Sequence, residues 1–217
     1  RIDPSVSNIV DVYMLERTYD NLFRVWLQDG GTKPEASTSD QMRISYSGTL
    51  NPLKSLSDQI IYHPVKYRIL FGTNADEQLQ ATFKIVKNTK TNVTDAVIKT
   101  RVIVAINEFF ALDNWDFGDA FYYTELAAYI HNQLAPDLLT AVIVPNQSGQ
   151  TFGSLFQINS AADEIFISGA TVDDVSIITA LGANQLAVSG TVVTSTPTAT
   201  TNTTTGSAVS GSTTTGS

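Results

Sequence analysis

Apolar residues in the first part of the chain recur first with the spacing of a strand and then with that of a helix. The segment from Asn8 to Glu16 is rich in β-branched and apolar residues, which predicts a strand. The segment that follows carries large apolar side chains at helical spacing, at Tyr19, Leu22, Phe23 and Trp26. Gly30 and Gly31 provide a stop signal for this predicted helix.

A second strand closes this first unit. Residues 32–48 are polar and rich in turn formers, and Pro52 to Ser57 predicts a short helix with proline at its first position. The strand period of two then follows, with Val65, Tyr67, Ile69 and Phe71 alternating with Lys66, Arg68 and Leu70. We therefore interpret residues 1–72 as a strand–helix–strand unit.

Residues 73–187 predict a second unit with two consecutive helices and short strands. In ATFKIVKN, Phe83 and Ile85 share one face of a predicted strand. Asn92 or Thr94 can cap the next helix. Its predicted buried stripe is formed by Ile98, Val102, Ile106 and Phe109. A further helix over about Thr124 to Leu134 presents one apolar face, made by Leu126, Ile130 and Leu134.

The rest of this unit predicts strands. The run TAVIVP is continuously apolar, which favours a buried strand, and TFGSLFQI and DEIFISG predict two more strands joined as a hairpin across Asn159 to Ala162. Strands and helices mix here without a repeated βαβ order. We therefore expect an α+β fold with two small strand/helix units and mixed sheets.

Residues 188–217 form a Thr/Ser-rich, uncharged tail. The last 29 residues contain 12 Thr and 6 Ser, and no charged residue occurs from Val175 onwards. Such a segment buries too little apolar surface to offset its ordering entropy, so disorder is the default expectation. Thr and Val also favour strands, so a partner that orders the tail as an added edge strand is the alternative.

Composition narrows the classes of function. The chain of 217 residues has no cysteine, which excludes disulfides, zinc–thiolate sites and thiol catalysis. Its net charge is −8 and its 13 basic residues are scattered, so nucleic acid is not expected as a ligand. No apolar run is long enough for a membrane span. Because the chain begins at Arg1 without an initiator Met, we expect a longer gene product.

The segment from Phe109 to Ile130 holds eight aromatic rings and four acids around Gly118. Asp113, Asp116 and Asp119 are three residues apart, whereas a calcium loop of the EF-hand type needs a ligand at every second position. A metal site and a catalytic carboxylate pair stay possible alternatives. A structural turn is the favoured interpretation, since acids near the start of a helix interact well with its dipole.

Other chemistry finds little support in the residues. His63 lies in a Tyr-His-Pro segment and His131 lies late in a predicted helix, and neither has a metal-ligand partner at helical spacing. The chain contains no phosphate-binding glycine loop and no G-x-S-x-G motif. We therefore expect no enzyme activity, and no catalytic, metal-binding or cofactor-binding residues.

The aromatic residues of the same segment give the candidate site. Trp115 and Phe117 flank Gly118 outside either helical stripe. They either plug the end of the helix pair or anchor another subunit, since aromatic residues are enriched at interface centres. Trp115, Phe117 and Tyr122 are the candidate subunit-interface residues.

The order of the segments also resembles a known family. The segments IIYHPVKYRILFG, ATFKIVKN, INEFFALDNWDFGDAFYYTELAAYI, NQLAPDLLTAVIVPNQ, TFGSLFQI and DEIFISG follow one another as in the C-terminal portion of the baseplate wedge protein of T-even-type, contractile-tailed bacteriophages, within the baseplate J-like group. The stretches NWDFGD and NQLAPDL are the most specific, and the resemblance spans roughly residues 1–168. It does not extend to the Thr/Ser-rich tail.

The resemblance implies a structural role in the virion, at the tail baseplate, after assembly in the host cytoplasm. In that family, C-terminal regions pair with each other and link neighbouring wedges into a ring around the tail hub. The implied partners are a second copy of the chain, other baseplate wedge subunits and the sheath-initiating subunit. The alternative is a tail-associated binding module whose Thr/Ser-rich end contacts a host surface. Deleting residues 189–217 separates the two, because only the binding module predicts lost adsorption with intact tails.

Overall fold

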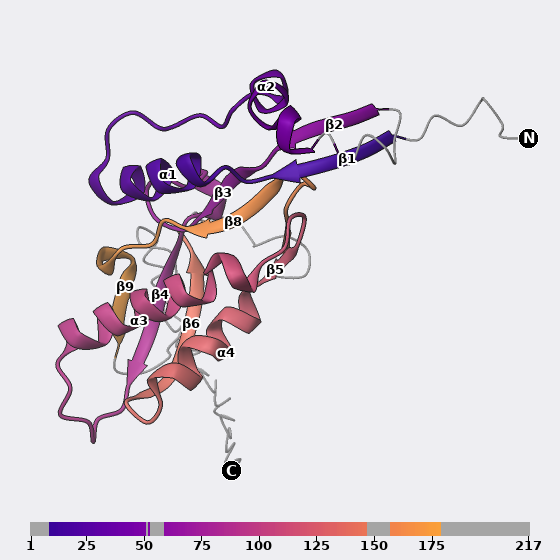
Figure 1. Cartoon of the computed structure of the whole chain (residues 1–217). Helices are drawn as coiled ribbons and strands as arrows, with labels where there is room; N and C mark the ends of the chain where they lie inside the picture. Colours follow the sequence, from indigo (N-terminus) through magenta and orange to yellow (C-terminus); the bar gives the residue numbers. More distant parts are fainter. Residues whose placement is uncertain (1–8, 51, 53–58, 147–156, 179–217) are drawn as a thin grey trace, which may run out of the picture.

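The chain combines helices with mixed sheets, which confirms the α+β class (Figure 1). The computed structural model describes residues 9–50, 52, 59–146 and 157–178. Most of the predicted short helix after Pro52, residues 151–156 and the tail lie outside this part. The helices are α1 (Arg17–Asp29), α2 (Ser39–Leu50), α3 (Asp95–Phe109) and α4 (Tyr123–Leu134). The strands are β1 (Ile9–Met14), β2 (Gln59–Pro64), β3 (Lys66–Leu70), β4 (Ala81–Lys87), β5 (Ala120–Tyr122), β6 (Leu138–Pro145), β7 (Gln157–Asn159), β8 (Glu164–Ser168) and β9 (Val175–Ile178).

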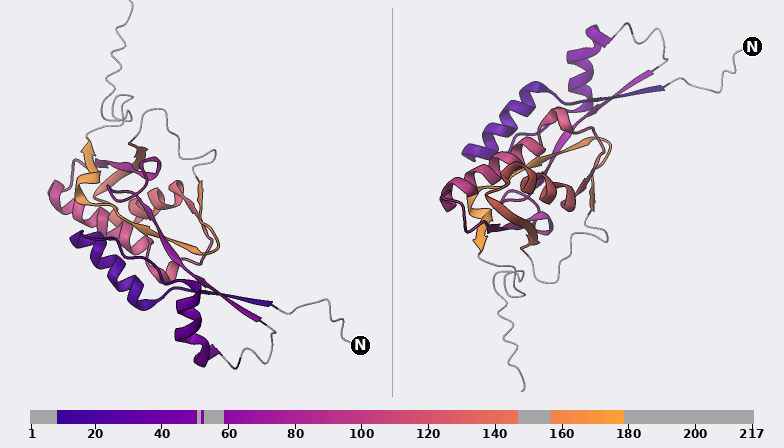
Figure 2. Two further views of the ribbon diagram at one scale, coloured as in Figure 1. Left: turned by 90° about the horizontal axis from the view of Figure 1, so that it is seen from above. Right: turned by 90° about the horizontal axis from the view of Figure 1, so that it is seen from below.

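Strands β1 and β2 pair in parallel and, together with α2, project from the body of the molecule (Figures 1 and 2). We call these three elements the arm. Met42 of α2 is buried against Ile60 and Tyr62 of β2. Helix α2 therefore covers one face of this two-stranded sheet.

Helix α2 was missed by the sequence interpretation, which assigned residues 32–48 to turns. The helix begins with reciprocal hydrogen bonds: the Gln41 backbone N–H reaches Thr38 Oγ1 (3.3 Å), and Gln41 Oε1 accepts from the Thr38 backbone N–H (2.8 Å). This is a capping box, and its T-x-x-Q pattern was present in the sequence. Met42, Tyr46 and Leu50 lie four residues apart on the face that packs on β2, but only Met42 is fully buried, so the apolar stripe is a weak signal.

Strands β3 and β8 form a second parallel pair, which lies between α1 and the main core. Tyr67 and Ile69 of β3 pack on Tyr19 and Phe23 of α1, as the predicted alternation requires. Leu70 is also buried, because the opposite face of this strand pair packs on the main core. In α1 the predicted stripe was wrong at Leu22, whose side chain is 55% exposed.

The pairing of β3 with β8 joins the two predicted units. Arg68 and Glu164 form an ion pair across it (3.4 Å), although they lie 96 positions apart in the chain. The boundary after residue 72 therefore does not separate the sheets, because β3 precedes it and β8 follows it. The division of the chain into units 1–72 and 73–187 stays a prediction.

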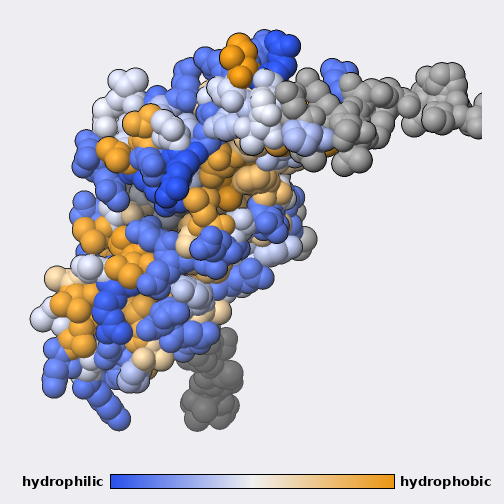
Figure 3. Space-filling model, viewed as in Figure 1, coloured by the Kyte–Doolittle hydropathy of each residue, from blue (hydrophilic) through white to orange (hydrophobic). Residues whose placement is uncertain are grey.

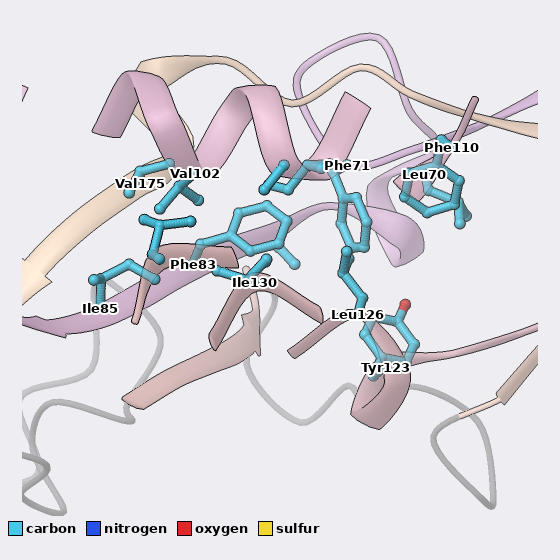
Figure 4. Close-up of a cluster of buried hydrophobic side chains, with 14 of the residues drawn as sticks. Leu70, Phe71, Phe83, Ile85, Val102, Phe110, Tyr123, Leu126, Ile130 and Val175 are labelled. Carbon is cyan, nitrogen blue, oxygen red and sulfur yellow. The ribbon is translucent and has the colours of Figure 1, made fainter. Parts of the chain in front are cut away.

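The main core lies between the helix pair α3–α4 and the mixed sheet β6–β4–β9. The predicted stripes of both helices are confirmed except at Phe109, which is only half-buried. Leu126 and Ile130 of α4 are fully buried, as are Ile98, Val102 and Ile106 of α3. Figure 4 shows Phe71 and Phe83 beside these helices, with their ring centroids 5.0 Å apart in an edge-to-face arrangement. Thr94 is the residue that caps α3.

Three strand expectations differ from the structure. Strand β6 covers the predicted run TAVIVP but is mostly half-buried, because it forms an edge of its sheet. The hairpin across Asn159 to Ala162 is wrong: β7 pairs with β5 and β8 pairs with β3. Strand β9 was not predicted, and it pairs in parallel with β4. These pairings join distant segments, so local pattern does not specify them.

The surface carries apolar groups in several separate patches. Figure 3 shows them among polar side chains on the body and on the arm. Among the large apolar residues with exposed side chains are Ile44 (76%) on α2, and Ile9 (46%) and Tyr13 (38%) on β1. No helix of the described residues is both long and apolar enough to cross a membrane.

Asp137 joins the turn after α4 to the segment before α3 and to α3 itself. One carboxylate oxygen accepts from Thr91 Oγ1 (2.6 Å) and the other from Arg101 Nη1 (2.7 Å). The hydrogen bond from Thr91, followed by that from Arg101, lowers the pKa of Asp137 below its ordinary value of 3.8. Since the folded-state pKa is the lower one, this stabilisation is present above the unfolded pKa and is lost as pH falls through the folded pKa.

We therefore expect Asp137→Asn to lower the free energy of unfolding near neutral pH. The difference from the wild-type protein should narrow as pH falls below the ordinary pKa of an aspartate. Urea denaturation at a series of pH values measures this difference. The control is Asp173→Asn, which changes an exposed carboxylate in the same way. A difference that stays constant down to acid pH would contradict the assignment to the ionised carboxylate.

Candidate functional site

The segment after α3 closes the C-terminal end of that helix with its own side chains. The last carbonyls of a helix lack partners within the helix. Here Trp115 Nε1 donates to the Phe109 carbonyl (2.8 Å) and Asn114 Nδ2 donates to the Glu108 carbonyl (2.9 Å). Phe110 is the C-cap residue. The polar atoms of Trp115 and Asn114 thus have a structural use within the chain.

Gly118 and the acids around it form the turn into β5. Gly118 has a φ of +82°, which L side chains rarely adopt, and its backbone N–H donates to the Glu164 carbonyl (3.2 Å). Asp119 Oδ2 accepts from the Asp116 backbone N–H (2.8 Å). The favoured interpretation as a structural turn agrees with these contacts.

The rings of this segment form one aromatic cluster with rings from other elements. Trp115 stacks on Phe110 (5.5 Å between centroids) and meets Phe166 of β8 edge to face (5.4 Å). Fully buried Phe121 lies 4.9 Å from Tyr123. Trp115 packs against both the main core and the cluster under α1. It therefore links the two cores of the molecule.

Tyr123 is buried at the start of α4. Burial raises the pKa of its phenol above the ordinary value of 10, so the ring is neutral at physiological pH. It contributes to the packing as an apolar ring. This environment does not suit a general base at neutral pH, which requires a pKa close to the working pH.

The three interface candidates lie in different surroundings. Trp115 is half-buried within its own subunit, whereas Phe117 and Tyr122 are 39% and 37% exposed. The ring of Trp115 packs within its own subunit, as expected if it fills the end of the helix pair. Phe117 and Tyr122 remain accessible to a partner. Their role in a subunit interface stays a prediction.

An open groove of about 500 Å³ lies beside this segment. Its aromatic lining comes from Phe109, Trp115, Tyr122 and Tyr129, and its two carboxylates come from Asp119 and Glu125. Trp115 and Tyr122 thus line one surface feature, whereas Phe117 does not. Sequence reasoning missed Tyr129, although its position six residues after Tyr123 placed it on α4.

The acids of the segment do not gather. Asp113 and Asp116 are exposed, and Asp119 is used in the turn. Within the described residues, no group of three or more His, Cys, Asp or Glu side chains is placed to hold a metal ion. The arrangement offers packing and a surface groove, and it supplies no acid–base pair at hydrogen-bonding distance.

The face of β1–β2 that α2 does not cover was also missed as a candidate site, and we call it the uncovered face of the arm. His63 Nε2 lies 2.8 Å from Asp11 Oδ1, and the His63 ring stacks on Tyr13 with 4.7 Å between centroids. His63 thus has an acidic neighbour in space, although the sequence offers it none at helical spacing. Its partners lie about fifty positions earlier and meet it only through the parallel register of β1 and β2. His131 lies in the last turn of α4, as predicted.

No protein-family model matches the chain, and no curated protein matches its sequence.

Proposed function

We propose that the chain is a structural subunit of a contractile phage tail baseplate. In this role it pairs with a second copy, links wedges into a ring around the tail hub and supports sheath attachment. Its partners are a second copy, other wedge subunits and the sheath-initiating subunit, and its place is the virion. The segments NWDFGD and NQLAPDL support this identity through their resemblance to the wedge family.

The observation that carries an assembly role is the uncovered face of the arm. Parallel sheets are normally covered on both faces, and a two-stranded sheet alone is marginally stable. Helix α2 covers one face of β1–β2, while Ile9 and Tyr13 on the other face are exposed. Within the described residues, neither strand pairs with a third strand. We propose that protein from another subunit completes this sheet.

The candidate site supports the same role. Its polar atoms close a helix and a turn, and its buried rings fill a core. What remains accessible is an aromatic groove with polar surroundings, which is the composition of interface centres. An assembly role requires such surfaces and requires no reaction, so we propose none.

We expect Tyr13→Asp to weaken self-association. The substitution places a charge on the uncovered face of the arm, where a partner would bury it without compensation. The dissociation constant of the oligomer should rise by about tenfold or more, which corresponds to about 1.4 kcal/mol. Sedimentation velocity over a concentration series measures it against a monomer of 23.5 kDa.

The matched control is Ile44→Asp, which places the same charge on the outer surface of α2. It should leave the association unchanged. A wild-type chain that stays monomeric at high concentration, with no interface above about 1,000 Å² in its particle, would defeat the proposal. Negative-stain images of particles that contain the chain test the assignment directly, since the proposal requires a ring-shaped plate at the end of a sheathed tail.

A further inference from the structure

We infer that the groove beside Trp115 is a docking site for an arginine side chain of a partner protein. Four of the residues that line it are aromatic: Phe109, Trp115, Tyr122 and Tyr129. The charged lining consists of Asp119 and Glu125, and none of the described basic residues lines the groove. Aromatic faces and carboxylates both attract cations, so one kind of ligand satisfies the whole lining.

The carboxylates retain free capacity for such a ligand. Glu125 lies in the first turn of α4 and makes no hydrogen bond or ion pair with the described residues. Asp119 uses Oδ2 for the Asp116 backbone N–H, which leaves Oδ1 without a donor from the described part of the chain. A neutral occupant would desolvate these oxygens without compensation, whereas a cation would compensate them.

The flat aromatic rings that line the groove favour a guanidinium over an ammonium group. A guanidinium is planar, stacks on aromatic faces and carries donors in a fork that can reach two acceptors at once. Trp115 is fixed by its stacking on Phe110 and by its hydrogen bond to Phe109. The ring of Tyr129 packs on Phe109, with 5.4 Å between centroids. These rings are therefore held in place before any ligand arrives, which lowers the entropic cost of binding.

This inference rests on the proposed function only for the source of the side chain, which would be a neighbouring subunit of the ring. Arginine binding is a property of the groove itself. It is therefore testable on the full chain in solution, without particles.

The chain has two tryptophans, so Trp26→Phe leaves Trp115 as the only reporter of indole fluorescence. The probe is the peptide acetyl-Gly-Arg-Gly-amide. We expect a saturable change in Trp115 emission with a dissociation constant of about 1–10 mM, as suits a single side chain. The citrulline peptide has nearly the same shape without the charge and should bind at least about tenfold more weakly. The lysine peptide should bind about threefold more weakly.

Glu125→Gln in the same background should weaken arginine binding at least about threefold, since it removes a charge and keeps the side-chain shape. Asp173→Asn makes the same change outside the groove and should leave binding unchanged. Equal binding of the citrulline peptide, equal binding of the lysine peptide, or an unaffected Glu125→Gln variant would each overturn the inference. A groove that binds arginine in a chain not found in baseplates would contradict the proposed function and leave the inference intact.

Discussion

Phe121→Ala should lower the free energy of unfolding by about 3–5 kcal/mol, the range for removing a buried phenylalanine. Phe121 is fully buried in strand β5. Its ring lies within 6.2 Å, centroid to centroid, of Phe110, Trp115, Tyr123 and Phe166. These rings belong to the C-cap of α3, the following turn, α4 and β8. Their several origins limit how far the structure can relax into the cavity, so the cost should lie in the upper part of the range.

Equilibrium urea denaturation measures this change, with the transition followed by circular dichroism. The matched control is Phe117→Ala, which removes a phenylalanine ring from a position that is 39% exposed in the turn before β5. Its cost should be about 1 kcal/mol or less, as for substitutions away from the core. An equal loss of stability in both variants would contradict the conclusion that the aromatic cluster around Phe121 stabilises the fold.

The helices could be predicted because their signals are local. The stripes of α3 and α4 lie within single segments, and Thr94 precedes α3 as a capping residue should. Helix α2 was missed because its apolar stripe is short and weak: Met42 is fully buried, whereas Tyr46 and Leu50 are only partly buried. The capping box of Thr38 and Gln41 could be recognised in the sequence. It is a signal of only two residues, however, within the mostly polar segment 32–48.

Most strands could be predicted from local pattern, although β9 was not, whereas the pairing of the strands could not be predicted. Nothing near Lys66 indicates that β3 pairs with β8 across most of the chain. The same limit explains His63, whose contacts with Asp11 and Tyr13 depend on the register of two parallel strands. Local spacing describes which side chains share a face, and only the assembled fold brings distant strands together.

The structure has a turn rich in rings and acids around Gly118, but the sequence alone could not tell which of its rings are buried and which are exposed. Trp115 and Phe117 flank the same glycine, yet one packs inside the subunit and the other is exposed. The difference depends on where Phe110 and Phe166 lie, since their rings surround Trp115. Tyr129 completes the groove from a helix that sequence reasoning treated only as an apolar stripe.

Gly72→Ala should lower the free energy of unfolding by about 3 kcal/mol or more, through backbone strain and a clash together. Gly72 follows β3 with a φ of +69°, and a Cβ placed there would lie 1.9 Å from the Gly169 carbonyl oxygen. Gly169 in turn follows β8, and its backbone N–H donates to the Leu70 carbonyl (2.9 Å). The contact is between backbones, so no side-chain rotation can relieve it. Relief requires the ends of β3 and β8 to separate.

Substitutions at two other glycines separate the contribution of backbone strain from that of the clash. Gly118→Ala shares the left-handed φ, but its new Cβ would approach nothing closer than 3.4 Å, so it should cost only about 1–2 kcal/mol. Gly48→Ala, in the interior of α2 with open space around it, should instead raise stability by about 0.5–1 kcal/mol. The same urea experiment compares all three variants. An equal loss for Gly72→Ala and Gly118→Ala would mean that strain alone acts. A clearly larger loss of stability for Gly72→Ala than for Gly118→Ala would show that the close packing of the Gly72 and Gly169 backbones, at the ends of β3 and β8, stabilises the fold.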